Sequence, residues 1–391
     1  MQQTLRPAFC VFLNMQANNN IIIAGGGLAG LTCALHLLKA GFEVTVIEKN
    51  TYPQHKVCGE YISNEVLPYL QWLNADPGIL QPKEITRLQI STVKGRQIEC
   101  NLPLGGFGLS RAAFDHFLYS KALEKGCKIL NEKILDIAYS SQGFSLKTDT
   151  ATHQTPLLIG AFGKRSSLDK KLNRHFIDQK SPWLAVKAHY KGEFEDNLVA
   201  LHNFSGGYCG VSKVETNLIN ICYLTAYDQF KKYQNMEDFQ QQVLFKNKHL
   251  KHLFEHTELA FESPLTIAQI CFEKKELVKD HVLMIGDAAG LIHPLCGNGM
   301  GMAIHSAKIC AELIIQQHGI SDQFQLEKNY TKQWTANFEQ RMAFGKRLSS
   351  LLLNGVLSDV AMATLIRFPS LLPQMIKRTH GKPLTTPPSY D

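Results

Sequence analysis

The sequence predicts an α/β fold: a Rossmann-like βαβ domain, an antiparallel-sheet domain and a helical C-terminal region. Three observations support this class. Near the N-terminus, a strand, a glycine turn, a helix and a second strand follow one another. Alternating apolar and polar runs between residues 183 and 224 indicate an antiparallel meander, and helical periodicity extends from 329 to 377.

Length and composition are those of a folded protein with two domains or one interleaved pair of domains. The chain has 391 residues, 45% of them apolar and 19% charged, and its basic residues exceed its acidic ones by 41 − 34 = 7. The basic residues are scattered, so we expect no nucleic-acid partner. The ten cysteines show no CxxC spacing, so we expect free thiols, no metal site and a cytoplasmic protein.

A glycine motif lies between the first predicted strand and the first predicted helix. It has the form GxGxxG, whose glycines permit a tight turn, close approach of a pyrophosphate and packing of helix on strand. The helix N-terminus adds free N–H groups and a positive dipole end. An acidic residue ends the next strand, where a carboxylate accepts hydrogen bonds from ribose. The predicted contacts are Gly25, Gly27, Leu28, Ala29, Gly30, Glu48 and Lys49.

A second motif follows a buried strand at 281–285. Here an aspartate is delivered to a glycine bend, and a second helix N-terminus follows within a dozen residues. One nucleotide does not need both motifs, whereas FAD does, because its ribityl chain and ring extend beyond the adenosine diphosphate. The predicted contacts are Gly286, Asp287, Gly297, Gly299, Met300, Gly301 and Met302.

The two motifs, in this order and 286 − 25 = 261 residues apart, resemble those of a flavoprotein superfamily. It comprises aromatic hydroxylases, geranylgeranyl reductases and flavin-dependent halogenases, and the resemblance covers about residues 20 to 318. The run from Lys56 through Cys58 and Gly59 is similar to the Lys-x-Cys-Gly-Gly segment of the geranylgeranyl reductase group. Arg111 matches the arginine helix that lies beside FAD. The resemblance therefore implies that these four residues contact the flavin cofactor.

Two departures from the superfamily pattern concern the reaction. Hydroxylases carry Gly-Ala-Asp-Gly-x-x-Ser in their central motif, whereas residues 160–166 place Phe162 where the aspartate stands. The resemblance therefore leaves the electron donor open between NADPH and a partner reductase. The Trp-x-Trp-x-Ile-Pro motif of halogenases is absent, which disfavours halogenation.

The domain boundaries follow from these patterns. Segment 60–104 belongs either to the FAD-binding domain or to the substrate domain. The predicted parts are a flexible tail or over-called start at 1–19, an FAD-binding domain at 20–182 and 264–318, an antiparallel substrate domain at 183–263 and a helical cover at 319–391.

Four residues are candidates for catalysis or substrate contact. Cys58 either touches flavin or substrate or is a small buried apolar residue. His293 either lies over the flavin ring as a proton donor or only satisfies backbone groups. His202 and Tyr208, on predicted meander strands, either face a substrate pocket or belong to the core.

The resemblance favours a reductase that transfers hydride from reduced FAD to a double bond of an apolar substrate. The alternatives are an FAD-dependent monooxygenase acting on an aromatic or polyketide product, and a non-catalytic FAD-binding redox sensor. Apolar runs and basic residues after position 347 either pack on the protein or rest on a membrane surface. The expected partner is an apolar small-molecule substrate. A partner reductase and peripheral contact of the C-terminal helices with a membrane are further expectations.

Overall fold

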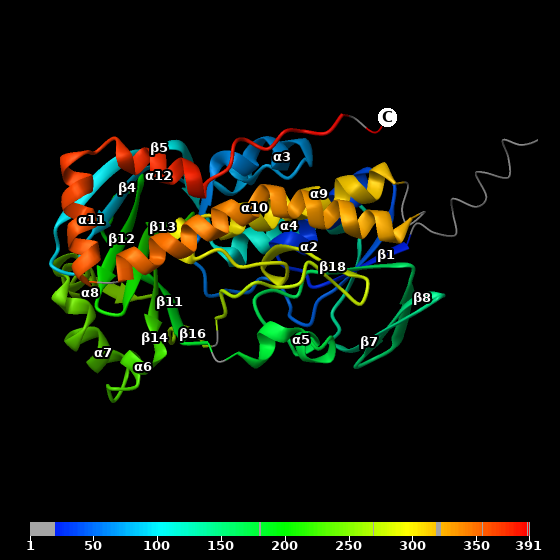
Figure 1. The fold of residues 1–391 in the computed structure, drawn as a ribbon, viewed down its shortest axis with the longest axis horizontal. Coiled ribbons are helices and arrows are strands. Elements are labelled where there is room, and N and C mark those ends of the chain that lie inside the picture. Colours follow the sequence, from blue (N-terminus) through cyan, green and yellow to red (C-terminus); the bar gives the residue numbers. More distant parts are fainter. Residues whose placement is uncertain are drawn as a thin grey trace, which may run out of the picture.

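The computed structural model describes residues 20–179, 181–268, 270–317, 322–353, 355–388 and 390 (Figure 1). The predicted tail or over-called start at 1–19 lies outside these residues. Two large sheets stand side by side, each covered by helices, and the C-terminal helices span both. The fold is therefore α/β with one mostly parallel and one mostly antiparallel sheet.

The first sheet has six strands, and all but β17 run parallel to their neighbours. In sheet order they are β17 (Val278–Lys279), β18 (Val282–Met284), β10 (Leu157–Gly160), β1 (Asn20–Ala24), β2 (Glu43–Ile47) and β6 (Lys128–Leu130). The three isoleucines of β1 are at most 2% exposed, because helices and loops cover both faces of a parallel sheet. This burial explains the unbroken β-branched run in the sequence.

Helices cover this sheet, with α2 (Leu28–Lys39) packed between α4 (Arg111–Glu124) and α9 (Gly299–Gln316). The long α10 (Gln323–Leu353) lies along α9 (Figure 1). A small separate sheet extends from the domain beside a short helix. Its parts are β7 (Ile134–Ser140), β8 (Gly143–Thr148), β9 (Thr152–Thr155) and the helix α5 (Ser167–Lys171).

The second sheet has nine strands, which pair antiparallel except where β12 meets β4. In order they are β15 (Thr257–Leu259), β11 (Trp183–Gly192), β14 (Ile219–Ala226), β13 (Gly207–Lys213), β12 (Leu198–Phe204), β4 (Lys83–Ser91), β5 (Gln97–Gly108) and β3 (Tyr61–Ser63), with β16 (Leu265–Ala268) beside β11. The strands of segment 60–104 therefore lie in the antiparallel sheet.

The structure corrects two helices that the sequence pattern predicts. The pattern of residues 60–73 predicts a helix, but this segment begins with β3, because Glu60 adopts a φ of 54° and residues 61–63 pair with β5. The pattern of residues 230–253 also predicts a helix, but Asn235 and Asn247 interrupt it as N-caps. The resulting elements are α3 (Leu67–Trp72), α6 (Tyr227–Phe230), α7 (Met236–Gln242) and α8 (Lys248–Glu255).

The C-terminal helices α11 (Gly355–Arg367) and α12 (Leu371–Thr379) pack on β5. Beyond α12 the chain returns across the first domain (Figure 1). There the hydroxyl of Tyr390 lies 2.7 Å from Nε2 of His36 in α2. Within the described residues, no helix is both long and apolar enough to cross a bilayer.

Candidate functional site

A cavity of about 690 Å³ connects the two sheets. At one end it is bounded by Gly25, Gly27 and Glu48, at the carboxyl ends of β1 and β2, where parallel sheets bind ligands. The other end is bounded by apolar side chains of the second sheet and of α11 and α12. These include Leu88, Ile90, Leu102, Val199, Leu201, Leu365, Leu372, Met375 and Ile376.

The three motif glycines have different tasks in the turn between β1 and α2. Gly25 has a φ of +114°, and a Cβ there would lie 2.4 Å from the carbonyl oxygen of Ala161. A Cβ on Gly30 would lie 2.0 Å from the carbonyl oxygen of Gly25. A Cβ on Gly27 would instead point into the cavity, with its nearest atoms 3.8 and 3.9 Å away. Gly25 and Gly30 thus permit packing, and Gly27 leaves room for a ligand.

Glu48 is held in place at the end of β2. Its Oε2 accepts a hydrogen bond from the Gly26 amide at 2.8 Å, and its Oε1 accepts from the Asn50 amide and side chain at 3.0 and 2.9 Å. Both Glu48 and the adjacent Lys49 line the cavity. A fixed carboxylate at this position can accept from ribose hydroxyls, as predicted from the sequence.

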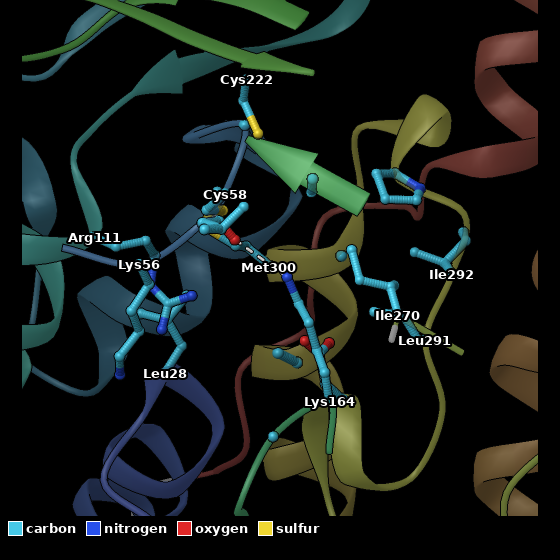
Figure 2. Close-up of a pocket in the computed structure, with 18 of the residues that line it drawn as sticks. Leu28, Lys56, Cys58, Arg111, Lys164, Cys222, Ile270, Leu291, Ile292 and Met300 are labelled. Carbon is cyan, nitrogen blue, oxygen red and sulfur yellow. Dashed lines mark hydrogen bonds between the residues drawn. The ribbon is translucent and has the colours of Figure 1, made fainter. Parts of the chain in front are cut away.

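A buried carboxylate holds two cations beside Gly27. Asp115 accepts from Lys56 Nζ at 2.8 Å and from Arg111 Nε and Nη2 at 2.9 and 2.8 Å. Burial alone would raise the pKa of Asp115, but the two cations outweigh it and the pKa lies below its usual range. Arg111 and Lys56 stand together above Leu28 at the cavity wall (Figure 2). They are positioned to bind the diphosphate of a dinucleotide.

The second motif forms the cavity wall opposite Lys56 and Arg111, at the same end of the cavity. Asp287 lines the cavity, and its carbonyl oxygen accepts from the buried Lys275 ammonium at 2.7 Å. Burial lowers the pKa of Lys275 to about 8. A Cβ on Gly299 would meet nothing closer than 4.0 Å, so the start of α9 is open to a ligand. Met300 contacts Cys58 at the cavity wall, with their sulfur atoms 3.7 Å apart.

Not every predicted contact of the second motif reaches the cavity. Gly286 adopts a φ of +60° and packs against Ala29, where a Cβ would approach to 2.8 Å. Gly301 and Met302 are buried in α9 and do not line the cavity. A Cβ on Gly301 would lie 2.2 Å from Asn298 Oδ1, so this glycine serves packing. The cavity-facing residues of this motif are Asp287, Gly297, Gly299 and Met300.

These features fit FAD. The space at Gly27 lies beside two cations, as a diphosphate requires, and Glu48 is placed for the adenosine ribose. Asp287 and the open start of α9 lie where the ribityl chain and ring would follow. The cavity thus has a cofactor end, defined as the walls around residues 25–60, 111 and 287–300, and an apolar end formed by the second sheet, α11 and α12.

Cysteine side chains flank the middle of the cavity. Cys58 lines it, and its carbonyl oxygen accepts from Asn220 Nδ2 at 3.2 Å. Cys222 of β14 lies above Cys58 (Figure 2), and burial raises its pKa to about 12, so it stays a thiol. Tyr208 also lines the cavity and is buried. Cys58 and Tyr208 are therefore placed where a ligand can touch them.

The two predicted histidines lie elsewhere. His202 faces away from the cavity, because its neighbour Leu201 faces inward and side chains alternate along a strand. Its Nδ1 contacts Ser91 Oγ at 2.9 Å. His293 lies behind the cavity wall, 4.8 Å from the Phe272 ring, and burial lowers its pKa to about 4. The structure thus corrects the predicted substrate contact of His202 and the predicted placement of His293 over the ring.

Sequence reasoning missed an ionic cluster at the cavity wall. Glu60 lines the cavity and pairs with Lys187 and His189 of β11, all three nearly or fully buried. The available signal was two ionisable side chains, two positions apart, in a strand whose residues 184–190 are otherwise apolar. Their partner could not be identified without the structure.

Comparisons with known proteins find similarity to flavoproteins. The family model for FAD-dependent oxidoreductases matches residues 20–60, and that for squalene epoxidase matches residues 248–351. The chain is 22% identical to a 1H-pyrrole-2-carbonyl-[peptidyl-carrier protein] brominase of Pseudoalteromonas luteoviolacea, over 76% of this chain and 77% of that protein. It is also 22% identical to digeranylgeranylglycerophospholipid reductase 1 of Methanopyrus kandleri, over 85% and 90%.

A solved structure shares the fold throughout. That of the flavin-dependent brominase Bmp2 has a TM-score of 0.77 and 18% identity, and covers 93% of each chain. The paired glycine motifs, the open space beside Lys56 and Arg111, and these relatives lead to one conclusion. The chain is an FAD-dependent oxidoreductase related to the flavin-dependent halogenases and geranylgeranyl reductases.

Proposed function

We propose that this enzyme reduces a double bond in an apolar unsaturated substrate. The observation that carries the proposal is the apolar end of the cavity, where aliphatic side chains of the second sheet meet Leu365, Met375 and Ile376 of the C-terminal helices. Such walls bind hydrocarbon and offer few partners to a polar ligand. The relative from Methanopyrus kandleri, a reductase of a polyprenyl lipid by name, supports the same substrate class.

When bound, reduced FAD supplies a hydride, and the residues of the chain bind, orient and shield the reactants. Lys56 and Arg111 hold the diphosphate, and the free amides at the start of α9 favour negative charge at the ring edge. The apolar end aligns the substrate chain toward Cys58 and excludes water from the reacting atoms.

A second candidate is a monooxygenase that hydroxylates an aromatic or polyketide product. The match of residues 248–351 to the squalene epoxidase family favours it, because that family is named for an oxygenation. Halogenation finds support in the brominase relatives, but the missing Trp-x-Trp-x-Ile-Pro motif speaks against it.

Oxygen dependence separates the candidates. Purified enzyme is photoreduced without oxygen and mixed with an unsaturated polyprenyl alcohol, while the visible flavin band and the product mass are followed. A reductase restores the flavin band anaerobically and saturates a double bond. Substrate oxidation that needs oxygen supports the monooxygenase and contradicts the reductase.

The electron donor is NADPH or a partner reductase. Phe162 lines the cavity and brings no hydrogen-bond acceptor to the bend after β10, which supports slow direct reduction by NADPH. Stopped-flow bleaching of the flavin with NADPH alone, and then with a ferredoxin-type reductant, tests this. Rapid bleaching by NADPH that Phe162→Asp leaves unchanged would contradict it.

The apolar end also supports contact of this enzyme with a membrane surface. Val360 and Ile366 of α11, Phe368 in the turn after it and Leu371 of α12 are exposed, beside Arg367. Co-sedimentation with vesicles containing anionic lipid, with Phe368→Ser as the comparison, tests the contact. Equal sedimentation of the two proteins would contradict it.

A further inference from the structure

A buried carboxylate occupies the cavity wall two residues after Cys58. Glu60 is fully buried, and its Oε1 accepts from the Arg111 amide at 2.8 Å and from Lys187 Nζ at 3.0 Å. Its Oε2 lies 2.6 Å from Nε2 of His189. One carboxylate thus joins the helix that carries Arg111 to strand β11 of the second sheet.

A second histidine extends this cluster to solvent. His55 is exposed, and its ring centroid lies 5.1 Å from that of His189. The ligand atoms of His55, His189 and Glu60 all lie within 4.8 Å of one another, a separation that one water molecule can bridge. Phe261 packs against both histidine rings, at 4.7 and 4.9 Å. The three groups therefore form a compact cluster that extends from the exposed His55 to Glu60 at the cavity wall.

The charges around this cluster disfavour binding of a metal ion. Two histidines and a carboxylate are common zinc ligands, but the Lys187 ammonium already binds the carboxylate and would repel a cation. Nor does packing alone account for the cluster, since apolar residues would join the same elements without the cost of burying charges. The arrangement is suited to moving a proton.

The surrounding groups keep Glu60 ionised, so that it can accept a proton. Burial alone would raise the pKa of Glu60, but the hydrogen bond to His189 and the charge of Lys187 outweigh it, so the pKa is lowered. The charged groups facing His55 are Lys187, His189, Glu60 and Glu215, and its pKa is lowered, chiefly by burial. Glu60 is therefore ionised at neutral pH, beside a histidine that can carry the proton.

We propose that His55, His189 and Glu60 form a proton path between solvent and the cofactor end of the cavity. When the bound flavin takes up two electrons one at a time, one proton passes from solvent to His55, from His55 through a bridging water to His189, from His189 to Glu60 and from Glu60 into the cavity. Each group then regains its original state, so the path carries one proton without net change in its own charge. When an acceptor that takes electrons but no hydrogen oxidises the flavin, the proton leaves in reverse.

The proposal rests on FAD binding and holds for a reductase or a monooxygenase whose flavin receives electrons from a partner reductase, because each electron pair then requires one proton from solvent. The test uses the FAD-loaded full chain, photoreduced without oxygen and mixed with ferricyanide in weak buffer. Ferricyanide accepts electrons but no protons, so recovery of the flavin band reports oxidation and a pH-indicator dye reports proton release.

In the wild type, proton release coincides with flavin recovery. In Glu60→Gln and His55→Phe we expect it to lag, slowed about a hundredfold, as for loss of a positioned acid or base. His256→Phe, a change at an exposed histidine outside the cluster, is the control and leaves the two signals coincident. Should Glu60→Gln fold poorly, the exposed position of His55 keeps the test available.

Two results would overturn the proposal, and a third would contradict the FAD binding on which it rests. Coincident signals in both variants, with normal FAD content, would overturn it. Stoichiometric zinc that survives dialysis of the wild type and is lost in Glu60→Gln would replace the proton path with a metal site. Absence of any flavin band would contradict FAD binding itself, a failure distinct from the other two.

Discussion

The two ends of the cavity are formed by different kinds of chemical groups. At the cofactor end, backbone atoms, glycines and buried ions define the shape, and a Cβ on Gly30 would approach a carbonyl oxygen to 2.0 Å. At the apolar end, aliphatic side chains such as Leu372 and Met375 form the wall. Apolar walls tolerate changes of similar volume, whereas backbone sites do not tolerate an added atom. The cofactor end is thus the rigid part and the apolar end the adaptable one.

The sharpest test of this contrast compares two glycines of one turn. In Gly30→Val the new side chain meets backbone, so we expect loss of the folded protein. In Gly27→Val it enters the cavity without meeting protein, so we expect folded, colourless protein. Circular dichroism and the flavin absorbance of purified samples measure both. Stoichiometric FAD in Gly27→Val would contradict the placement of the diphosphate.

A smaller effect concerns pH and His293, which lies behind the cavity wall of residues 287–300. The pKa of His293 falls from 6.5 in the unfolded chain to about 4 in the folded one. Its contribution to stability is therefore full above pH 6.5 and is lost as the pH falls toward 4, by about 3 kcal/mol. Urea unfolding across this range should show a weaker pH dependence in His293→Phe than in wild type. An equal dependence in both proteins would count against a buried neutral imidazole.

At the cofactor end, Asp287→Ala removes a charged acceptor beside the ribityl position. We expect FAD affinity to fall by about 1.5–3 kcal/mol, the usual contribution of a hydrogen bond to a charged group. Fluorescence titration of the apoprotein with FAD measures this, and Glu99→Ala, at a position outside the cavity, serves as the control. An unchanged affinity would show that this bend is structural only.

The smallest effect on the cofactor is expected from the apolar end. Met375→Ala removes wall contacts without touching the cofactor end, so KM for the substrate should rise about tenfold, as for loss of a few methylene contacts. FAD affinity should stay unchanged. A parallel loss of FAD would show that the two ends are not separable.

The same contrast explains what the sequence could predict. Gly25, Gly27 and Glu48 lie within one βαβ unit, so their spacing alone indicates a nucleotide site. Asp287 could be predicted because it follows another strand of the same parallel sheet, β18. Gly301 and Met302 were predicted as contacts but are buried, because the sequence does not tell which side of a helix start faces the ligand.

The apolar end and the ionic cluster depend on long-range pairing that no local pattern reveals. The direction of His202 depends on the strand's register within the sheet, and one residue of shift reverses it. Glu60 was placed in a predicted helix, but its positive φ and the pairing of β3 with β5 turn it toward Lys187, far away in the sequence.

The order in which the chain is made separates the two ends of the cavity in time. Every described element of the cofactor end has been synthesised once α9 is complete, whereas α11 and α12, which close the apolar end, follow later. Segments made first can fold first during translation. A nascent chain therefore contains every residue of the cofactor end before the last wall of the apolar end exists.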